Sequence, residues 1–371
     1  MIFITEERIK EIKKKVESDI YLKRELKELA EKSMKVSPLS VTFHKSPAVT
    51  GNPHDFYSEG PYWWPNPENP DGPYIKRDGE FNPDRFNAHM DDLFTFTSTV
   101  SILCQVGFYL DRRAYLDRAA ELINVWFIDE DTKVNPHMEC GQAIRGVCDG
   151  RGIGIIDTSN YIKVVYGADI LERVGGYQKT VDGLKEWFRQ YITWLTTSEK
   201  GLEEKNFFNN HSNWWNTQVA VFSAFTGDDN QLSECFDSYR NRILSEQTDT
   251  EGKFVDEITR TRSYHYTLYN MDACTIIAEV AYHRGVDLWN YETVDGKSLK
   301  KCVEFFKPYY KNPFLWKYPE INAEECHLEK MSLKLAAVRF DDAEIERTNI
   351  IRRKNIVPGS QMCFLGIMDL I

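Results

Sequence analysis

Apolar residues recur along most of the chain at the spacing of one helix face. Between residues 5 and 34 they fall at every third or fourth position, which predicts one long opening helix or two shorter ones. The same spacing returns after residue 87 in successive pairs of segments, and each pair is joined by a short turn. The pairs are 87–110 with 112–127, 159–174 with 178–197, 212–226 with 229–246, 265–284 with 297–310, and 322–338 with 341–354. Consecutive helices with short connections are typical of stacked αα-hairpins.

The pattern contains little of the alternation that marks strands. Residues 254–264 are ambiguous between a short strand and an extended loop. No strict internal repeat is visible, which argues against a regular helical solenoid. We therefore predict an all-α protein, an incomplete α/α toroid (barrel) built from helical hairpins, with a groove across one end.

One long segment interrupts the helical pattern near the N-terminus. Residues 36–86 are rich in proline, glycine, asparagine and aromatic residues, a composition that excludes a helix. Loops of this length are usually functional or disordered, and the many aromatic residues argue against disorder. We predict a single catalytic domain over 1–371, with an N-terminal helix (1–35), this substrate-cleft loop, the helical hairpins (87–354) and a C-terminal tail (355–371).

Composition narrows the class of partner and compartment. The 371 residues are 42% hydrophobic, enough for a sizeable core, and the formal net charge of −11 argues against nucleic acid as a partner. An anionic sugar polymer stays possible, because a local basic cleft can exist on an acidic protein. The eight cysteines form no CxxC pair and suit buried free thiols of a reducing compartment. No signal peptide or membrane-spanning run is visible, so we expect a cytoplasmic protein, or a secreted or periplasmic one if a leader preceded this sequence.

Two clusters of polar and aromatic side chains lie in the first half of the chain. The substrate-cleft loop carries flat apolar rings of the kind that stack on sugars, although burial is the simpler explanation for any single ring. Its candidates are His44, Tyr62, Trp63, Trp64 and Arg77. The second cluster, NPHMECGQAIRGVCDGRGIGIIDT (135–158), sets Gln142, Arg145 and Arg151 among glycines. These glycines do not form the GxGxxG pattern of a dinucleotide site.

Two further clusters lie in the second half. NFFNNHSNWWN (206–216) fits a helix start, since Asn and Ser are good N-caps, as well as it fits a sugar-binding catalytic site. RTRSYHYTLYN (260–270) places two arginines beside three tyrosines. A guanidinium beside a phenol favours the phenolate, which lets a tyrosine act as a general base and then as an acid. A helix start with packed tyrosines and solvated arginines explains the same segment equally well.

Other catalytic templates find little support. The chain has no GxSxG elbow and no HExxH motif, and its eight histidines show no pair at i, i+4, which argues against a metal site. A glycoside hydrolase needs two carboxylates that sequence spacing does not reveal. The acidic residues Asp91, Asp92, Asp157 and Asp256 keep that alternative open.

The four clusters together resemble the alginate lyase superfamily of polysaccharide lyases. GPYWWPNPENPDGPYIKRDGEFNPD, GQAIRGVCDGRGIGIIDT, NNHSNWW and RTRSYHY follow the order of that family over roughly residues 40–285. The resemblance implies an α/α toroid that cleaves 4-linked uronic-acid glycans, alginate, polymannuronate or glucuronan-like, by β-elimination, leaving 4,5-unsaturated uronate ends. It implies no metal or organic cofactor, and an anionic uronic-acid polysaccharide or oligosaccharide as the partner, with no nucleic acid and no membrane.

The resemblance also suggests roles for single residues. Asn210 and His211 match the catalytic Asn-His pair, Arg260 the site arginine and Tyr266 the catalytic tyrosine. The family pattern YHxY is not kept, because Tyr266 follows the histidine directly, so Tyr264 is a second candidate for the phenol. The implied substrate-binding side chains are His44, Tyr62, Trp63, Trp64, Gln142, Arg145, Arg262, Tyr264, His265 and Tyr269.

Two other functions stay open at this point. An α/α-barrel glycoside hydrolase acting on uronic-acid oligosaccharides would use paired carboxylates and consume water. A non-catalytic sugar-binding protein on a lyase scaffold would bind without turnover. Fold-level analogy alone does not separate these from a lyase.

Overall fold

A computed structural model describes residues 2–327 and 331–352 of the chain. Its internal contacts divide the chain into two compact units, the first ending at Glu204 and the second beginning at Lys205. The single domain over 1–371 stays a prediction, and the tail 355–371 lies outside the described residues.

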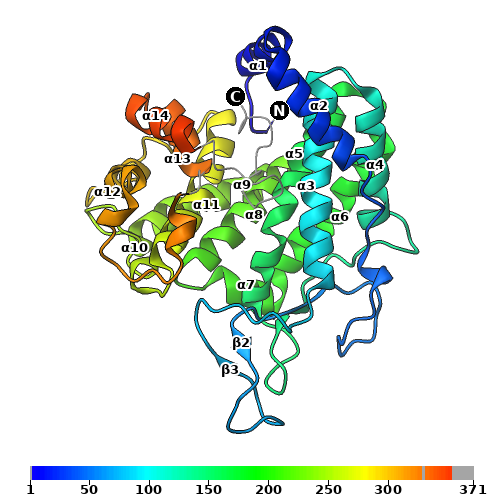
Figure 1. The fold of residues 1–371 in the computed structure, drawn as a ribbon, viewed down its shortest axis with the longest axis vertical. Helices are drawn as coiled ribbons and strands as arrows, with labels where there is room; N and C mark the ends of the chain where they lie inside the picture. Colours follow the sequence, from blue (N-terminus) through cyan, green and yellow to red (C-terminus); the bar gives the residue numbers. More distant parts are fainter. Residues whose placement is uncertain (1, 328–330, 353–371) are drawn as a thin grey trace. The chain divides into compact units, whose positions relative to one another are not determined.

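The first unit is built around helix α3. The opening segment forms two helices, because Asp19 ends α1 and its side chain accepts hydrogen bonds from the backbone of Tyr21 and Leu22 in α2. Every residue of α3 from Thr99 to Tyr109 is buried, and α3 packs against α4 and α5 (Figure 1). The helices are α1 (Glu6–Ser18), α2 (Ile20–Ser33), α3 (Ala88–Tyr109), α4 (Arg113–Phe127), α5 (Tyr161–Val174), α6 (Gln178–Thr197) and, at the boundary, α7 (Glu199–Lys205). The two hairpins predicted in this half are confirmed.

The proline-rich segment 36–86 contains no α-helix, as predicted, but it is more regular than a plain loop. It holds a 3-10 turn (Val41–Phe43) and three short strands, β1 (Tyr57–Glu59), β2 (Trp63–Trp64) and β3 (Ile75–Lys76). Strands β2 and β3 pair antiparallel in a hairpin that lies beyond the N-terminal end of α3 (Figure 1). Strand β1 pairs in parallel with β4 (Cys140–Ala143), which brings the two polar clusters of this half together. A long 3-10 segment (Gly152–Asn160) then leads into α5.

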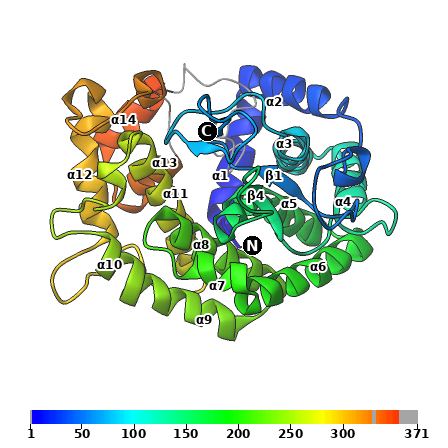
Figure 2. The same cartoon turned by 90° about the horizontal axis from the view of Figure 1, so that it is seen from below.

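The second unit consists of helices connected by short irregular segments. Helix α11 lies between α8 and α13 and packs against both (Figure 2). The elements are α8 (Asn210–Thr226), α9 (Asp229–Ser238), a π-helical turn (Tyr239–Leu244), α10 (Ser245–Gln247), α11 (Ser263–His283), α12 (Leu299–Lys311), α13 (Met331–Arg339) and α14 (Ala343–Arg352), with 3-10 turns at Glu257–Thr259, Pro313–Leu315 and Ala323–His327. Helix α8 ends at Gly227, whose φ of 82° requires the left-handed conformation that glycine adopts most easily.

Three sequence predictions are settled by these elements. The ambiguous stretch 254–264 forms no strand; it contains the 3-10 turn and single bridges from Phe254 to Thr248 and from Arg262 to Glu320. All cysteines within the described residues are free and all but Cys148 are buried, as expected, while Cys363 lies outside them. Among the described helices, none is long and apolar enough to span a membrane.

Candidate active site

Helix α8 begins inside the NNHS motif. Asn209 is its N-cap and accepts a hydrogen bond from the His211 backbone at 3.2 Å, so Asn210 is the first helical residue. Both tryptophans that follow, Trp214 and Trp215, are buried, at 0% and 2% exposure. Both rings therefore belong to the core, and the polar residues at the helix start are the ones left to act as a site.

Asn210 is held by a buried carboxyl group. Its backbone N–H donates to Oε1 of Glu257 at 2.7 Å, and its side-chain Nδ2 donates to the same oxygen at 2.8 Å. Asn270 Nδ2 reaches that oxygen at 3.4 Å and Oε1 of Gln247 at 3.2 Å. Gln247 in turn donates to Ser212 Oγ at 2.9 Å. This network of buried polar groups joins the start of α8 to the segments before and within α11.

Helices α8 and α11 run parallel, so that their N-terminal ends point the same way. Asn213 of α8 donates to Asn270 of α11 at 2.7 Å, and one turn later Thr217 donates to the Ala273 carbonyl at 3.0 Å. The N-terminal end of a helix carries a partial positive charge and unpaired N–H groups. Two such ends side by side favour an anion in front of them.

The tyrosine and histidine side chains of the segment RTRSYHYTLYN (260–270) lie at this same end. The Arg260 guanidinium lies 4.1 Å from the centre of the Tyr266 ring, and Tyr266 is 6% exposed. His265 stacks on Tyr269 with 5.8 Å between ring centres, and Tyr269 packs against Trp214 at 4.8 Å. The half-buried His211 ring lies 5.4 Å from that of Phe207. The second unit thus brings Asn210, His211 and Arg260 around the buried Glu257, and Arg260 lies over Tyr266.

Two residues of the same segment occupy core positions. Tyr264 is 1% exposed, packs edge-on against Phe306 and Trp316, and burial raises the pKa of its phenol. Arg262 is 2% exposed and forms a backbone bridge with Glu320. Such buried positions are typical of core residues at a helix start and not of residues that contact a polysaccharide. The substrate-binding role of both residues stays a prediction.

In the first unit, arginines lie over both rings of the tryptophan pair. Arg77 lies 4.9 Å from the ring centre of Trp64, whose Nε1 donates to the Glu80 carbonyl at 3.0 Å. Arg151 lies 5.9 Å from that of Trp63. All the rings of Tyr62, Trp63 and Trp64 are half-buried. They therefore keep exposed surface on a hairpin whose shape is fixed, which is what stacking on a sugar requires.

Gln142 is linked to this hairpin through Arg151, which lies over Trp63. It is 8% exposed and has a φ of 48°, an uncommon conformation for a residue other than glycine. Its side chain donates to Asp157 at 2.9 Å and accepts from Arg151 at 3.1 Å, while Ser58 donates to Asp157 at 2.6 Å. The Gln142 amide is engaged at both ends, so this predicted binding residue is placed to orient Arg151 and Asp157.

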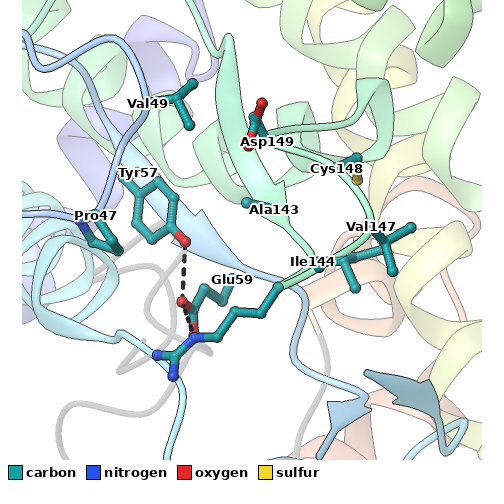
Figure 3. A pocket seen from close by; sticks show the side chains of 11 residues that line it. Pro47, Val49, Tyr57, Glu59, Ala143, Ile144, Val147, Cys148 and Asp149 are labelled. Carbon is teal, nitrogen blue, oxygen red and sulfur yellow. Dashed lines mark hydrogen bonds and ion pairs between the residues drawn. The ribbon is translucent and has the colours of Figure 1, made fainter. Parts of the chain in front are cut away.

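A pocket of about 430 Å³ opens beside the β1–β4 pair (Figure 3). Inside it the buried Glu59 accepts hydrogen bonds from Tyr57 at 3.0 Å and from Arg145 Nε at 2.8 Å. The Arg145 side chain is 48% exposed, so its outer edge faces solvent while its inner edge is fixed. His44, also in this unit, is bonded to Asp92 at 2.9 Å.

The sequence did not indicate that Glu257, Gln247 and Asn270 belong to the site. No motif marks them, and only the position of Glu257 three residues before Arg260 hints at a link. Within residues 2–327 and 331–352, no three histidine, cysteine or carboxylate side chains form a group that would hold a metal ion.

Helical hairpins, with an Asn-His pair and an Arg-over-Tyr pair at the ends of two parallel helices, are the arrangement that the sequence resemblance leads us to expect of an α/α-toroid polysaccharide lyase. The model of the alginate lyase family matches residues 40–316, and the chain belongs to this family. The resemblance found in the motifs is therefore confirmed. No match was found among curated proteins.

Solved structures agree with the family. The chain is similar to an alginate lyase from Bacteroides ovatus, with 29% identity, a TM-score of 0.88 and 98% of each chain covered. It is also similar to alginate lyase A1-III from Sphingomonas species A1, with 17% identity, a TM-score of 0.54, and 91% of this chain and 88% of that one covered. A variant of A1-III complexed with a tetrasaccharide matches with 17% identity and a TM-score of 0.55, over 90% of this chain and 87% of that one. At this identity the A1-III structures support the fold alone.

Proposed function

We propose that the protein cleaves 4-linked uronic-acid glycans, alginate, polymannuronate or glucuronan-like, by β-elimination. The observation that carries the proposal is the Arg260 guanidinium over Tyr266 at the end of α11 that lies beside the Asn210–His211 start of α8. The family match supports an oligosaccharide or polysaccharide substrate.

The first task of such a reaction is to neutralise the substrate carboxylate. The C5 proton beside that group is only weakly acidic while the carboxylate keeps its full negative charge. Asn210 Nδ2 donates to it, His211 adds a second donor, and the N-terminal ends of α8 and α11 favour the anion. Preorganised donors of this kind are often the largest catalytic contribution, because they stabilise charge that develops only in the transition state.

The second task is proton transfer, which we assign to Tyr266. Its phenolate, favoured by Arg260, takes the C5 proton; the electron pair forms the C4–C5 double bond as the C4–O4 bond breaks, and O4 receives a proton. In mannuronate and glucuronate H5 and O4 lie on the same side, so Tyr266 performs both steps. In guluronate they lie on opposite sides, so His211 acts as base and Tyr266 as acid.

The first unit supplies candidates for sugar binding. We assign stacking on sugar faces to Tyr62, Trp63 and Trp64, whose rings are half-buried and so keep exposed surface. The outer edge of Arg145 is suited to pair with a uronate carboxylate, because its inner edge is already fixed on Glu59.

A direct assay tests this function. Purified protein incubated with polymannuronate, polyguluronate or glucuronan is expected to form a product that absorbs in the near ultraviolet. His211→Ala is expected to lower the rate about a hundredfold or more without unfolding the protein. Wild-type protein that gives no such product on any of the three polymers would contradict the proposal.

The same assay separates the alternatives. A glycoside hydrolase would release reducing ends without a new double bond, and a sugar-binding protein would show affinity without turnover. Asp92 and Asp157, two carboxylates that kept the hydrolase open, are bonded to His44 and to Ser58 in the first unit. Both are therefore engaged in fixed polar pairs, which supports the lyase.

A further inference from the structure

Glu257 is a buried acid at the centre of the proposed site that no motif pointed to. It is 1% exposed, and its Oε1 accepts hydrogen bonds from the backbone and side chain of Asn210 and from Asn270. Its Oε2 is buried and has no hydrogen-bond partner within the described residues. A carboxyl group with one crowded and one bare oxygen is unusual, because buried polar atoms are nearly always paired.

The crowded oxygen determines which way the Asn210 amide faces. An asparagine amide has an accepting oxygen on one side and two N–H groups on the other. Oε1 of Glu257 accepts, so it selects the orientation with Nδ2 towards Glu257. One N–H of Nδ2 is used in this bond, and the second is left to donate to a substrate carboxylate. The reversed amide would present an oxygen to that carboxylate and repel it.

The second oxygen, Oε2, determines whether Glu257 can be neutral and so affects the charge of the site. Burial raises the pKa of Glu257, although the hydrogen bonds from Asn210 and the charges of Arg260 and His211 oppose this. A proton on Oε2 leaves all three bonds to Oε1 in place. The acid form thus keeps the geometry and removes a negative charge that would face the carboxylate of the substrate.

We propose that Glu257 is a positioning residue of the lyase reaction, which acts by holding the Asn210 amide with an N–H directed to the substrate carboxylate. The inference rests on the proposed function for its catalytic meaning. The proposed function does not say what orients Asn210, and we assign that role to Glu257. Glu257 itself does not touch the substrate in this account.

Four variants test the proposal by steady-state kinetics on the best uronate polymer. Glu257→Gln keeps an accepting oxygen in place and cannot carry a charge, so kcat is expected to stay within about threefold of wild type. Glu257→Leu has a similar volume but no acceptor, and kcat is expected to fall about a hundredfold, with a smaller change in KM. If Glu257→Leu does not fold, Glu257→Asp, which moves the acceptor by one methylene, takes its place with the same direction expected.

The remaining two variants ask whether Glu257 acts through Asn210. Asn210→Ala and the double variant Asn210→Ala with Glu257→Leu are expected to share the same kcat, because the second change has no amide left to orient. Glu279→Gln is the matched control, since Glu279 is also buried in this unit but is bonded to Arg339 and His283. It is expected to lower the melting temperature and leave kcat of the folded protein unchanged.

A purely structural role would look different. It would make Glu257→Leu as active as wild type per folded molecule, or make the losses in the double variant multiply. Equal loss in the Gln and Leu variants would show that the charge, and not the acceptor, matters. Each of these results overturns the proposal.

A measurement without turnover keeps this test separate from that of the proposed function. The side-chain NH₂ signal of Asn210 in a ¹H–¹⁵N spectrum, assigned by its loss in Asn210→Ala, is expected to exchange slowly with solvent in wild type and Glu257→Gln and rapidly in Glu257→Leu. Unchanged exchange in Glu257→Leu overturns the positioning role even if the enzyme is active. Wild-type protein with slow exchange but no product on any polymer overturns the lyase instead.

Discussion

Helix α11 carries a tyrosine covered by an arginine at each of its two ends. At the N-terminal end Arg260 lies 4.1 Å from the ring centre of Tyr266. At the C-terminal end Arg339 lies 3.6 Å from that of Tyr282. The pairs are alike in chemistry and nearly alike in distance. An Arg-over-Tyr contact by itself therefore does not identify a catalytic site.

The buried glutamates beside the two pairs differ. At the C-terminal end the Glu279 carboxylate accepts hydrogen bonds from Nε and Nη2 of Arg339 and from Trp289, and it is also bonded to His283. Burial alone would raise the pKa of Glu279, but the bonds from His283 and Arg339 outweigh it and lower the pKa. At the N-terminal end Glu257 takes its hydrogen bonds from amides, and burial raises its pKa.

This difference distinguishes a catalytic site from an ion pair that only stabilises the fold. An ion pair whose charges are matched, as at the C-terminal end, holds elements together and has nothing to offer a ligand. A carboxyl group bonded to the amide of Asn210, at the N-terminal ends of two parallel helices, leaves the positive ends of those helices available to an anion. Perturbed ionisable groups are markers of function only when such surroundings accompany them.

Substitution of the two tyrosines is expected to give the largest difference in kcat between the two ends of α11. Tyr266→Phe removes only a hydroxyl group and is expected to lower kcat about a thousandfold, because that hydroxyl carries the proton in our account. Tyr282→Phe makes the same change at the other end and is expected to leave kcat within about twofold, since it touches no reacting group. Initial rates of product absorbance in the near ultraviolet measure both. Equal rates for the two variants would remove the basis of the comparison.

Substitution of Arg260 is expected to lower activity, whereas substitution of Arg339 is expected to lower stability. Arg260→Met should lower kcat about a hundredfold, because it removes the charge that favours the phenolate. Arg339→Met should leave kcat of the folded protein unchanged but destabilise it by about 3 kcal/mol, because it leaves Glu279 buried without its partner. Urea unfolding and kinetics on the same samples measure the two effects. An Arg339→Met protein that is stable but inactive would refute this division.

Arg145 in the first unit is expected to show a smaller effect, confined to binding. Arg145→Met should raise KM about tenfold and leave kcat within about twofold, because we assign Arg145 to binding a uronate carboxylate and not to proton transfer. Lys45→Met, an exposed lysine of the same unit, is the control and should change neither constant. A fall in kcat with unchanged KM would place Arg145 at the reacting sugar instead.

The pH dependence of stability should have opposite signs at the two glutamates. The pKa of Glu257 is raised in the folded protein, so its contribution is complete below its ordinary value of 4.5 and is lost as the pH rises. Glu257→Gln should therefore gain stability relative to wild type between pH 4 and pH 7. The pKa of Glu279 is lowered, so its contribution is present above 4.5 and lost as the pH falls.

Glu279→Gln should accordingly lose most stability near pH 7 and approach wild type at acid pH. Melting temperatures across this range check both signs. Curves that run parallel to wild type for both variants would show that neither carboxyl group is perturbed as described.

The helices could be predicted because their signal is local. Apolar spacing placed most hairpin helices of both units to within a few residues. The helix predicted over 322–338 is the exception, because the described residues there form a 3-10 turn (Ala323–His327) and α13 (Met331–Arg339). The same spacing gave no sign of α7 (Glu199–Lys205), which is short, or of strand β4, which pairs with a strand far away in the chain. The family motifs supplied Asn210, His211, Arg260 and Tyr266, and the structure brings the segments that carry them together within the second unit.

What could not be predicted depends on contacts between distant residues. Glu257 is 47 positions from Asn210, and nothing in a single sequence links the two. Gln142 appeared as a binding residue because of its polar type, whereas its buried bonds to Arg151 and Asp157 are properties of the folded chain. Sequence identifies the groups capable of the chemistry, and the packing around each group decides how it is used.

The most direct test of the account is the fate of water during cleavage. Wild-type protein should be incubated with its best uronate polymer in oxygen-labelled water, and the products analysed by mass spectrometry and near-ultraviolet absorbance. β-Elimination should give products that absorb in the near ultraviolet, carry no label at the cleaved bond and are together lighter by one water than hydrolysis products. Labelled products without absorbance would contradict β-elimination and make the protein a hydrolase.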